Sequence, residues 1–165
     1  MSFAHLTLAT QDVIASSQFF QQTLGWTPIS QPGNINRTAD WLDIAPGQQL
    51  HLLLVEGFEV SNFEAEFGRH FAIFFPGSEF TELKLRLLEE GAELIDPIRD
   101  TPFERFFFKD PNGYIFEVID KEGYSPEKNC SLLNFAVSQM SARVLFFSTF
   151  HNPDVSVPNR ASVIL

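Results

Sequence analysis

The chain has 165 residues, enough for one domain with a substantial core. Its formal net charge of −10 at pH 7 excludes ligands that need a basic footprint, so we expect neither a nucleic acid nor an anionic membrane as a partner. The single cysteine, Cys130, excludes an internal disulfide framework. With no signal-like N-terminus and no apolar run of membrane-spanning length, the sequence predicts a soluble cytoplasmic protein.

The first third of the chain predicts a strand, a helix and three further strands. His5 lies in the first strand, Thr10 or Asp12 can cap the helix, and Gly25 ends it. His51 lies in the last strand of the series. The expected elements are a strand over 3–9, a helix to about 24, and strands over 26–30, 40–45 and 48–55.

After an acidic connector over 56–68, the same order of elements begins again. His70 lies in the first strand, and the following helix starts at Ser78 and ends at Gly91. The expected elements are a strand over 69–75, a helix from 78, a short strand over 93–98, and hairpin strands over 105–108 and 114–119.

The two series are related by an offset of 65 or 66 residues. His70 follows His5 by 65 residues, because 70 minus 5 is 65, and Glu117 follows His51 by 66, because 117 minus 51 is 66. This repeat predicts an α+β fold of two βαβββ modules with mixed sheets, over 3–55 and 69–123. Residues 124–165 have no counterpart in the repeat and are expected to form an apolar C-terminal extension of the same domain, packed on it or on a second subunit.

Alternation across the strands separates the histidines from the leucines beside them. His5 and His51 share a face with neither Leu6 nor Leu52, since successive side chains point to opposite faces of a sheet. We expect the leucine faces to pack against the helices and the histidines to face a cavity.

The Asp110-Pro111-Asn112-Gly113 turn fixes the register of the last hairpin. These residues suit a type I turn followed by glycine in the left-handed region, which makes a three-residue loop with a bulge. Paired residue numbers then sum to 224, so that Glu117 lies across from Phe107, with Arg105 on the same face. A two- or four-residue loop would place a neighbouring phenylalanine across from Glu117 instead.

Four side chains form the candidate site: His5, His51, His70 and Glu117. A carboxylate inside an apolar strand is costly to bury unless it is paired or bound to a metal. Imidazole and carboxylate ligands together suit Zn, Ni, Fe, Mn or Co, so we expect a divalent metal ion. Two alternatives are structural histidines and a cavity that holds its ligand without metal. The fourth histidine, His151, is left out of the site.

Three further side chains are candidates for contact with a small-molecule substrate. Arg105 can grip a carboxylate in two places, which would suit an anionic substrate; the alternative is a salt bridge to Glu104 or another acid. Phe74 and Phe107 are expected to form part of the cavity wall.

At this point the sequence resembles the vicinal oxygen chelate superfamily, which contains glyoxalase I, extradiol dioxygenases, fosfomycin-resistance enzymes and bleomycin-resistance proteins. The resemblance covers about residues 3 to 123. It rests on Ala4-His5-Leu6-Thr7-Leu8, Thr23-Leu24-Gly25-Trp26, Leu50-His51-Leu52, Arg69-His70-Phe71-Ala72 and Asp110-Pro111-Asn112-Gly113-Tyr114-Ile115-Phe116-Glu117.

The resemblance implies eight strands in a curled mixed sheet around a metal-binding cavity. Ligands in such proteins come from the first and last strands of each module, which here implies His5, His51, His70 and Glu117. The modules of the superfamily sometimes pair between subunits, which would make the chain a homodimer. One departure is that glyoxalase I has an acid at the position of His51.

The implied function is that of a metal-dependent enzyme that chelates two neighbouring oxygens of a small substrate. A lyase or isomerase of glyoxalase I type is the first expectation, with Glu117 as the catalytic base. One alternative is an extradiol-type dioxygenase with Fe(II) or Mn(II) on two histidines and a carboxylate. Another is a non-catalytic binding or resistance protein.

Overall fold

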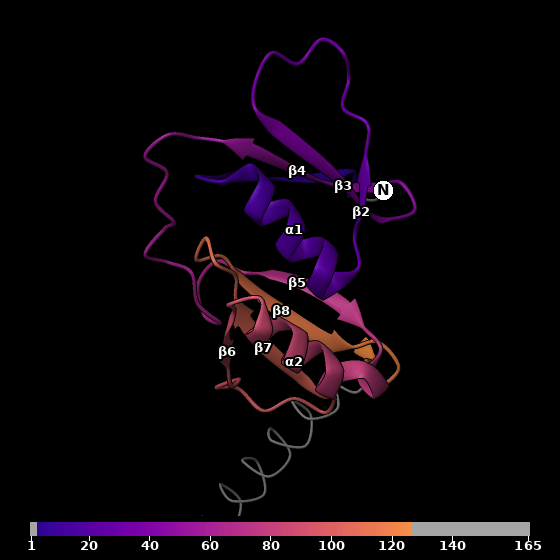
Figure 1. Ribbon diagram of the computed structural model, residues 1–165. Helices are drawn as coiled ribbons and strands as arrows, with labels where there is room; N and C mark the ends of the chain where they lie inside the picture. Colours follow the sequence, from indigo (N-terminus) through magenta and orange to yellow (C-terminus); the bar gives the residue numbers. More distant parts are fainter. Residues whose placement is uncertain (1–2, 127–165) are drawn as a thin grey trace, which may run out of the picture. The chain divides into compact units, whose positions relative to one another are not determined.

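The computed structural model describes residues 3–126, and the chain divides after Tyr124 into two units, residues 1–124 and 125–165. The first unit contains two βαβββ modules (Figure 1). Nearly all of the extension predicted over 124–165 lies outside the described residues.

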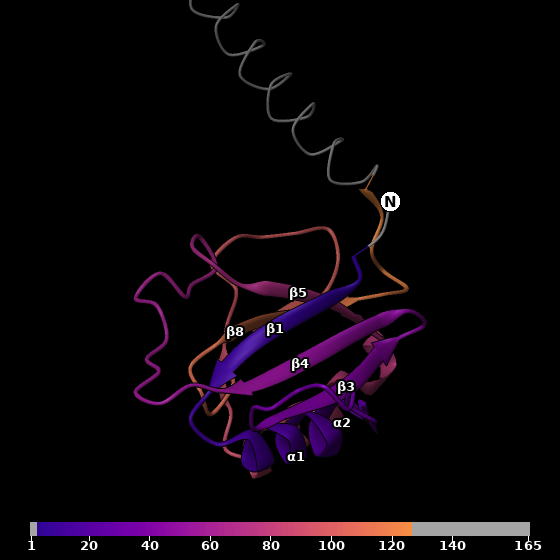
Figure 2. The same ribbon diagram turned by 90° about the horizontal axis from the view of Figure 1, so that it is seen from above.

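The first module is a four-stranded mixed sheet with one helix. Its strand order is β1-β4-β3-β2, with β1 parallel to β4 and the other pairs antiparallel. Figure 2 shows β1 and β4 side by side, with α1 along the sheet. The elements are β1 (His5–Thr10), α1 (Val13–Leu24), β2 (Thr27–Ile29), β3 (Ala39–Ala45) and β4 (Gln48–Leu54).

The second module repeats this topology. Its strand order is β5-β8-β7-β6, again with one parallel pair, β5 and β8. The repeat predicted from the 66-residue offset is therefore confirmed. The elements are β5 (Phe71–Phe75), the short 3-10 helix η1 (Gly77–Glu79), α2 (Phe80–Glu89), β6 (Glu93–Ile95), β7 (Arg105–Lys109) and β8 (Ile115–Asp120).

Five strands are shorter than the sequence predicts, namely β1, β2, β4, β5 and β6, and the shortening of β5 and β6 involves the connector over 56–68. β5 begins at Phe71, so His70 precedes it. The backbone there pairs with the connector instead of a strand, since Arg69 N donates to Phe63 O at 2.6 Å. β6 ends at Ile95, and the N–H of Ile98 donates to the carboxylate of Glu66.

The eight strands form two four-stranded sheets in the described residues, whereas one curled sheet was expected. Each module completes its own hydrogen-bond ladder, with β1 and β5 as edge strands. The modules join through side chains. Tyr114 Oη lies 3.1 Å from both the N–H and the carbonyl of Ala9, and Thr10 Oγ1 donates to Asn112 Oδ1 at 2.8 Å.

The two predicted caps of α1 take different roles. Asp12 caps the helix, because its carboxylate accepts a hydrogen bond of 3.0 Å from the N–H of Ala15. Thr10 instead hydrogen-bonds Ser16 at 2.7 Å. Gly25 ends the helix with φ of 72°, a left-handed conformation that glycine adopts without strain.

One hydrophobic core joins the helix-covered faces of both sheets. It contains leucines of β1 and β4, phenylalanines of β7 and β8, and the buried faces of α1 and α2: Leu8, Leu50, Leu52, Phe19, Phe20, Leu83, Leu87, Phe106, Phe108 and Phe116. By alternation, His51 lies on the opposite face of the first sheet, and Glu117 lies on the opposite face of the second. The predicted division between leucine and histidine faces is confirmed.

The hairpin register also agrees with the prediction. Phe107 pairs with Glu117, and Arg105 pairs with Ile119. Asp110 N donates to Tyr114 O at 2.9 Å, and Gly113 has φ of 97°, which is the expected left-handed glycine.

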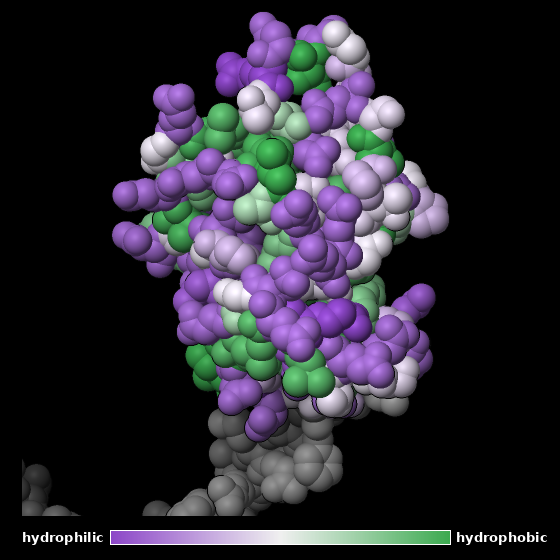
Figure 3. Space-filling model, in the orientation of Figure 1, coloured by the Kyte–Doolittle hydropathy of each residue, from purple (hydrophilic) through white to green (hydrophobic). Residues whose placement is uncertain are grey.

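No helix in residues 3–126 is long and apolar enough to cross a membrane. On the face shown in Figure 3, hydrophilic side chains predominate and hydrophobic ones are scattered among them, in keeping with the net charge of −10.

Asp110→Asn is expected to change how stability depends on pH. Burial of Asp110 raises the pKa of its carboxyl from 3.8 to about 6. Folding therefore favours the protonated acid, and the wild type loses stability as the pH rises from about 4 to 6. Asparagine carries no charge at any pH. The free energy of unfolding of Asp110→Asn relative to wild type should thus increase over this window, by an amount on the order of 2–3 kcal/mol.

Urea unfolding at a series of pH values measures this difference. A stability difference that stays the same from pH 4 to pH 7 would contradict a raised pKa at Asp110.

Candidate functional site

The first pair of predicted ligands, His5 and His51, comes from the adjacent strands β1 and β4. Their rings stack with centroids 4.3 Å apart and planes at 16°. Trp41 of β3 stacks on the other side of His51, at 3.8 Å. The indole N–H of Trp41 is buried and lacks an acceptor in the described residues. This face of the first sheet therefore presents a stack of three rings and one donor with no partner.

The surroundings of His51 favour its neutral form. Burial lowers the pKa of His51, and the neighbouring His5 lowers it further. Its Nε2 lies 3.0 Å from Gln49 Oε1. When Nε2 donates to Gln49, Nδ1 carries the free lone pair. A neutral imidazole with its second nitrogen hydrogen-bonded is the usual state of a metal-binding histidine.

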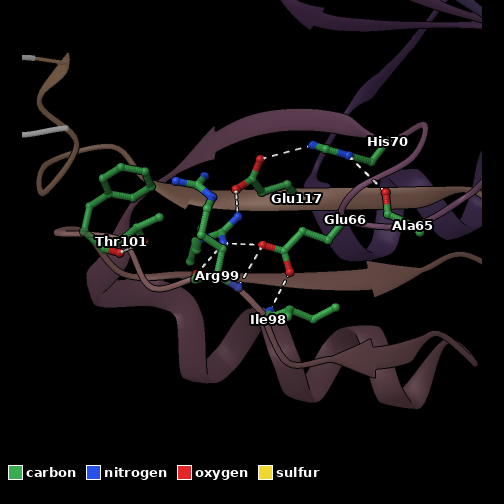
Figure 4. A network of polar contacts seen from close by, with 9 residues as sticks. Ala65, Glu66, His70, Ile98, Arg99, Thr101 and Glu117 are labelled. Carbon is green, nitrogen blue, oxygen red and sulfur yellow. Dashed lines mark hydrogen bonds and ion pairs between the residues drawn. The ribbon is translucent and has the colours of Figure 1, made fainter. Parts of the chain in front are cut away.

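The second pair is His70, the residue before β5, and Glu117 in the middle of β8. His70 Nε2 lies 3.4 Å from Glu117 Oε2, and His70 Nδ1 lies 3.3 Å from the carbonyl of Ala65 (Figure 4). A proton on Nδ1 would be donated to that carbonyl. The lone pair of Nε2 would then face the carboxylate, and two such electron-rich atoms are stabilised by a cation between them, either a proton or a metal ion.

Glu117 is also one end of a buried ion-pair network. Arg105 Nη1 donates to Glu117 Oε1 at 2.6 Å, and its Nη2 donates to Glu66 Oε1 at 2.5 Å. The Arg105 side chain is only 2% exposed. Burial alone would lower the pKa of Arg105, but its hydrogen bonds to Glu117 and Glu66 raise it. The guanidinium thus stays charged between two carboxylates.

The predicted substrate-binding residues have different surroundings. Arg105 makes a salt bridge, as in the alternative drawn from the sequence, but its partners are Glu66 and Glu117 rather than Glu104. Phe107 is buried, edge-on to His70 at 5.5 Å. Phe74 is 56% exposed and lies against Tyr124 at 5.0 Å. Their contact with a substrate remains a prediction.

The four predicted ligands lie together as two pairs. Within residues 3–126, no three His, Cys, Asp or Glu side chains converge as a metal-binding group. Each pair has donors that suit a transition-metal ion, and His51 and His70 have hydrogen-bonded second nitrogens. The donor atoms therefore suit a metal ion. Within the described residues, however, each pair provides only two of the four proposed ligands.

Three neighbours of the candidate ligands were not singled out from the sequence: Gln49, Trp41 and Glu66. Gln49 and Trp41 could have been found from alternation and strand pairing, since Trp41 pairs with His51. Glu66 could not, because the connector has no periodicity.

An open cavity of about 760 Å³ lies elsewhere, between the start of α1, the connector and the Pro111-Asn112 turn. Its lining includes Gln11, Ser16 and Phe58 and none of the predicted ligands. The histidine chemistry and this cavity are therefore separate features.

Comparison with known proteins identifies the family. Residues 2–118 match the model of the Glyoxalase/Bleomycin resistance protein/Dioxygenase superfamily. A protein of Arabidopsis thaliana named Glyoxylase I 4 is 26% identical over 123 residues, which cover 72% of this chain and 70% of the relative.

Solved structures show the same fold. FosX, a fosfomycin resistance protein of Mesorhizobium loti, matches with a TM-score of 0.62 at 12% identity, over 79% of this chain and 97% of FosX. A FosX variant of Listeria monocytogenes, complexed with Mn(II) and 1S,2S-dihydroxypropylphosphonic acid, matches with a TM-score of 0.61 at 19% identity, over 78% and 94% of the two chains. With its two βαβββ modules and a family match over most of its length, this chain belongs to the glyoxalase/bleomycin resistance protein/dioxygenase superfamily.

Proposed function

We propose that the protein is a metal-dependent enzyme of glyoxalase I type, a lyase or isomerase that holds a small substrate by two neighbouring oxygens. The observation that carries the proposal is the placement of His70 Nε2 and Glu117 Oε2, which face each other at 3.4 Å. The stacked His5 and His51 occupy the repeat-related positions of the other module.

Two similar proteins support this chemistry. One is named for glyoxalase I, and the other contains Mn(II) together with a phosphonate that carries hydroxyl groups on adjacent carbons. A divalent ion with imidazole and carboxylate ligands, chosen from Zn, Ni, Fe, Mn and Co, would suit such a substrate.

We further propose that a second copy of the chain completes the site. The His5–His51 pair of one protomer would meet the His70–Glu117 pair of its partner, giving a homodimer with two identical sites. Support comes from the separation of the two pairs within one chain and from the unpartnered Nε1 of Trp41 on the histidine face. An interface that covers this face could supply that acceptor.

The roles of the residues follow from their contacts. When bound, the ion would act as a Lewis acid toward the two substrate oxygens. Glu117 is the one carboxylate among the four proposed ligands, so the role of base for a carbon acid falls on it. Arg105 occupies Oε1 of Glu117 and leaves Oε2 toward His70. Phe74, exposed on the same face, offers an apolar contact to the substrate.

One observation favours a second reaction on the same site. The hydrogen bond of 2.6 Å from Arg105 occupies Oε1 of Glu117, which leaves a single oxygen for proton abstraction. A reaction that depends on stabilisation of negative charge by the metal, more than on proton abstraction by Glu117, would be less affected by this hydrogen bond. The candidate is a reaction on fosfomycin, as in the FosX proteins. Turnover of thiol-conjugated 2-oxoaldehydes, compared with loss of fosfomycin, distinguishes the two.

Metal content tests the proposed ligands. Wild type loaded with Co(II) and then desalted should retain about one ion per chain, since a dimer would have two sites. His70→Ala and Glu117→Ala should each retain much less, because each removes one of four ligands. His151→Ala is the matched control and should bind like the wild type. Unchanged cobalt in both ligand variants, measured by mass spectrometry of the metal, would contradict the assignment.

Complementation tests the shared site. The double variants His5→Ala/His51→Ala and His70→Ala/Glu117→Ala should each fail to bind Co(II). When the two are co-expressed, about half of the dimers should be mixed, and each mixed dimer should have one intact site of its two. Recovered binding should approach about a quarter of the wild-type value.

Ligands contributed by a single chain would give no recovery, because neither variant then has a complete set. Native mass spectrometry of the mixture confirms that mixed dimers are present.

A further inference from the structure

The connector over 56–68 reaches into the second module through Glu66. The Glu66 carboxylate is 7% exposed and accepts three backbone or side-chain donors. Oε1 accepts from Arg105 Nη2 at 2.5 Å and from Arg99 N at 3.2 Å, while Oε2 accepts from Ile98 N at 2.5 Å (Figure 4). A buried carboxylate with this many donors is fixed in one orientation.

Arg105 is thereby fixed as well. Its Nη2 donates to Glu66 and also to the carbonyl of Arg99 at 2.6 Å, and its Nη1 is left for Glu117. The face of the guanidinium lies over the ring of Phe107, 5.1 Å from its centroid. With one end held by Glu66, the guanidinium meets Glu117 through a single nitrogen and a single oxygen.

In this arrangement the two carboxylate oxygens of Glu117 have different partners. Oε1 accepts from Arg105, and Oε2 lies 3.4 Å from His70 Nε2. Without Glu66, Nη2 of Arg105 would keep only the carbonyl of Arg99, and the guanidinium could turn to engage both oxygens of Glu117, since arginine commonly binds a carboxylate through two nitrogens. In such a two-point contact, Oε2 of Glu117 would face Arg105 and would no longer face His70.

The net charge of the cluster also supports a role for Glu66 in metal binding. Glu66, Arg105 and Glu117 together carry a net charge of −1 when all are ionised, whereas Arg105 and Glu117 alone are neutral. A buried cluster with net negative charge favours a divalent cation beside it, and one that is neutral does not.

We propose that Glu66 is a positioning residue for the candidate ligand Glu117: by holding Arg105, it keeps Oε2 of Glu117 open and the cluster anionic, and so promotes binding of a divalent metal ion. This rests on the proposed function, which makes Glu117 a ligand. Glu66 itself touches neither the proposed ion nor a substrate.

The test compares Co(II) affinity and the visible spectrum of bound Co(II) in wild type, Glu66→Gln and Glu64→Gln. Glutamine removes the charge and leaves the size, so Glu66→Gln should bind Co(II) about tenfold more weakly and shift the spectrum, as outer residues of metal sites commonly do. Glu64→Gln is the matched control. Its side chain, 4% exposed, belongs to the same connector but pairs with Arg69. This control should leave affinity and spectrum unchanged.

The outcomes separate the two proposals. Equal affinity and an identical spectrum in wild type and Glu66→Gln would overturn the role of Glu66 while leaving the metal site in place. A wild type that binds no Co(II) would overturn both.

Glu66→Asp carries the test if Glu66→Gln does not fold, as judged by circular dichroism. Aspartate keeps the charge but is one methylene shorter, so it should not hold Arg105 Nη2 as Glu66 does. It should weaken Co(II) binding at least about fivefold, and unchanged affinity would refute the positioning role.

Discussion

The hydrogen bond between Arg105 and Glu117 is the interaction on which the candidate site depends. Glu117 lies in the middle of β8, between Phe116 and Val118, and is 7% exposed. A carboxylate in such surroundings must be paired or bound to a cation, because burial of an isolated charge is strongly unfavourable. Arg105 meets part of this need. The guanidinium is itself buried and has further N–H donors, and Glu66 accepts one of them from a connector outside the repeat.

The connector therefore orients side chains of the candidate site, a role that its amino-acid composition does not predict. It supplies Glu66 to Arg105 and the carbonyl of Ala65 to His70. The backbone hydrogen bond from Arg69 to Phe63 in the same connector accompanies the start of β5 after His70. The residue is oriented by the connector on one side and by Phe107 on the other. Two of the proposed ligands are thus positioned by the same short segment.

Local chemistry was enough to predict the modules and the last hairpin. The turn Asp110-Pro111-Asn112-Gly113 suits a three-residue loop with a bulge, and the Phe107–Glu117 pairing predicted from that loop is confirmed. The arrangement of the two sheets could not be predicted, because it depends on side-chain contacts between modules, such as Tyr114 with Ala9. Glu66 was missed for a related reason: its partners are 32 or more residues away, and no periodicity marks them.

The four proposed ligands lie as two pairs, one from each module. Each module brings two donors to the face opposite the shared core, and neither module alone has enough ligands for a closed site. The central claim is that the four side chains bind one ion. A crystal structure of the Co(II)-loaded protein, with an anomalous difference map at the cobalt edge, measures this directly. We expect one peak per site, ligated by His5 and His51 of one protomer and His70 and Glu117 of its partner. A peak bound by other residues, or no peak between these four, would contradict it.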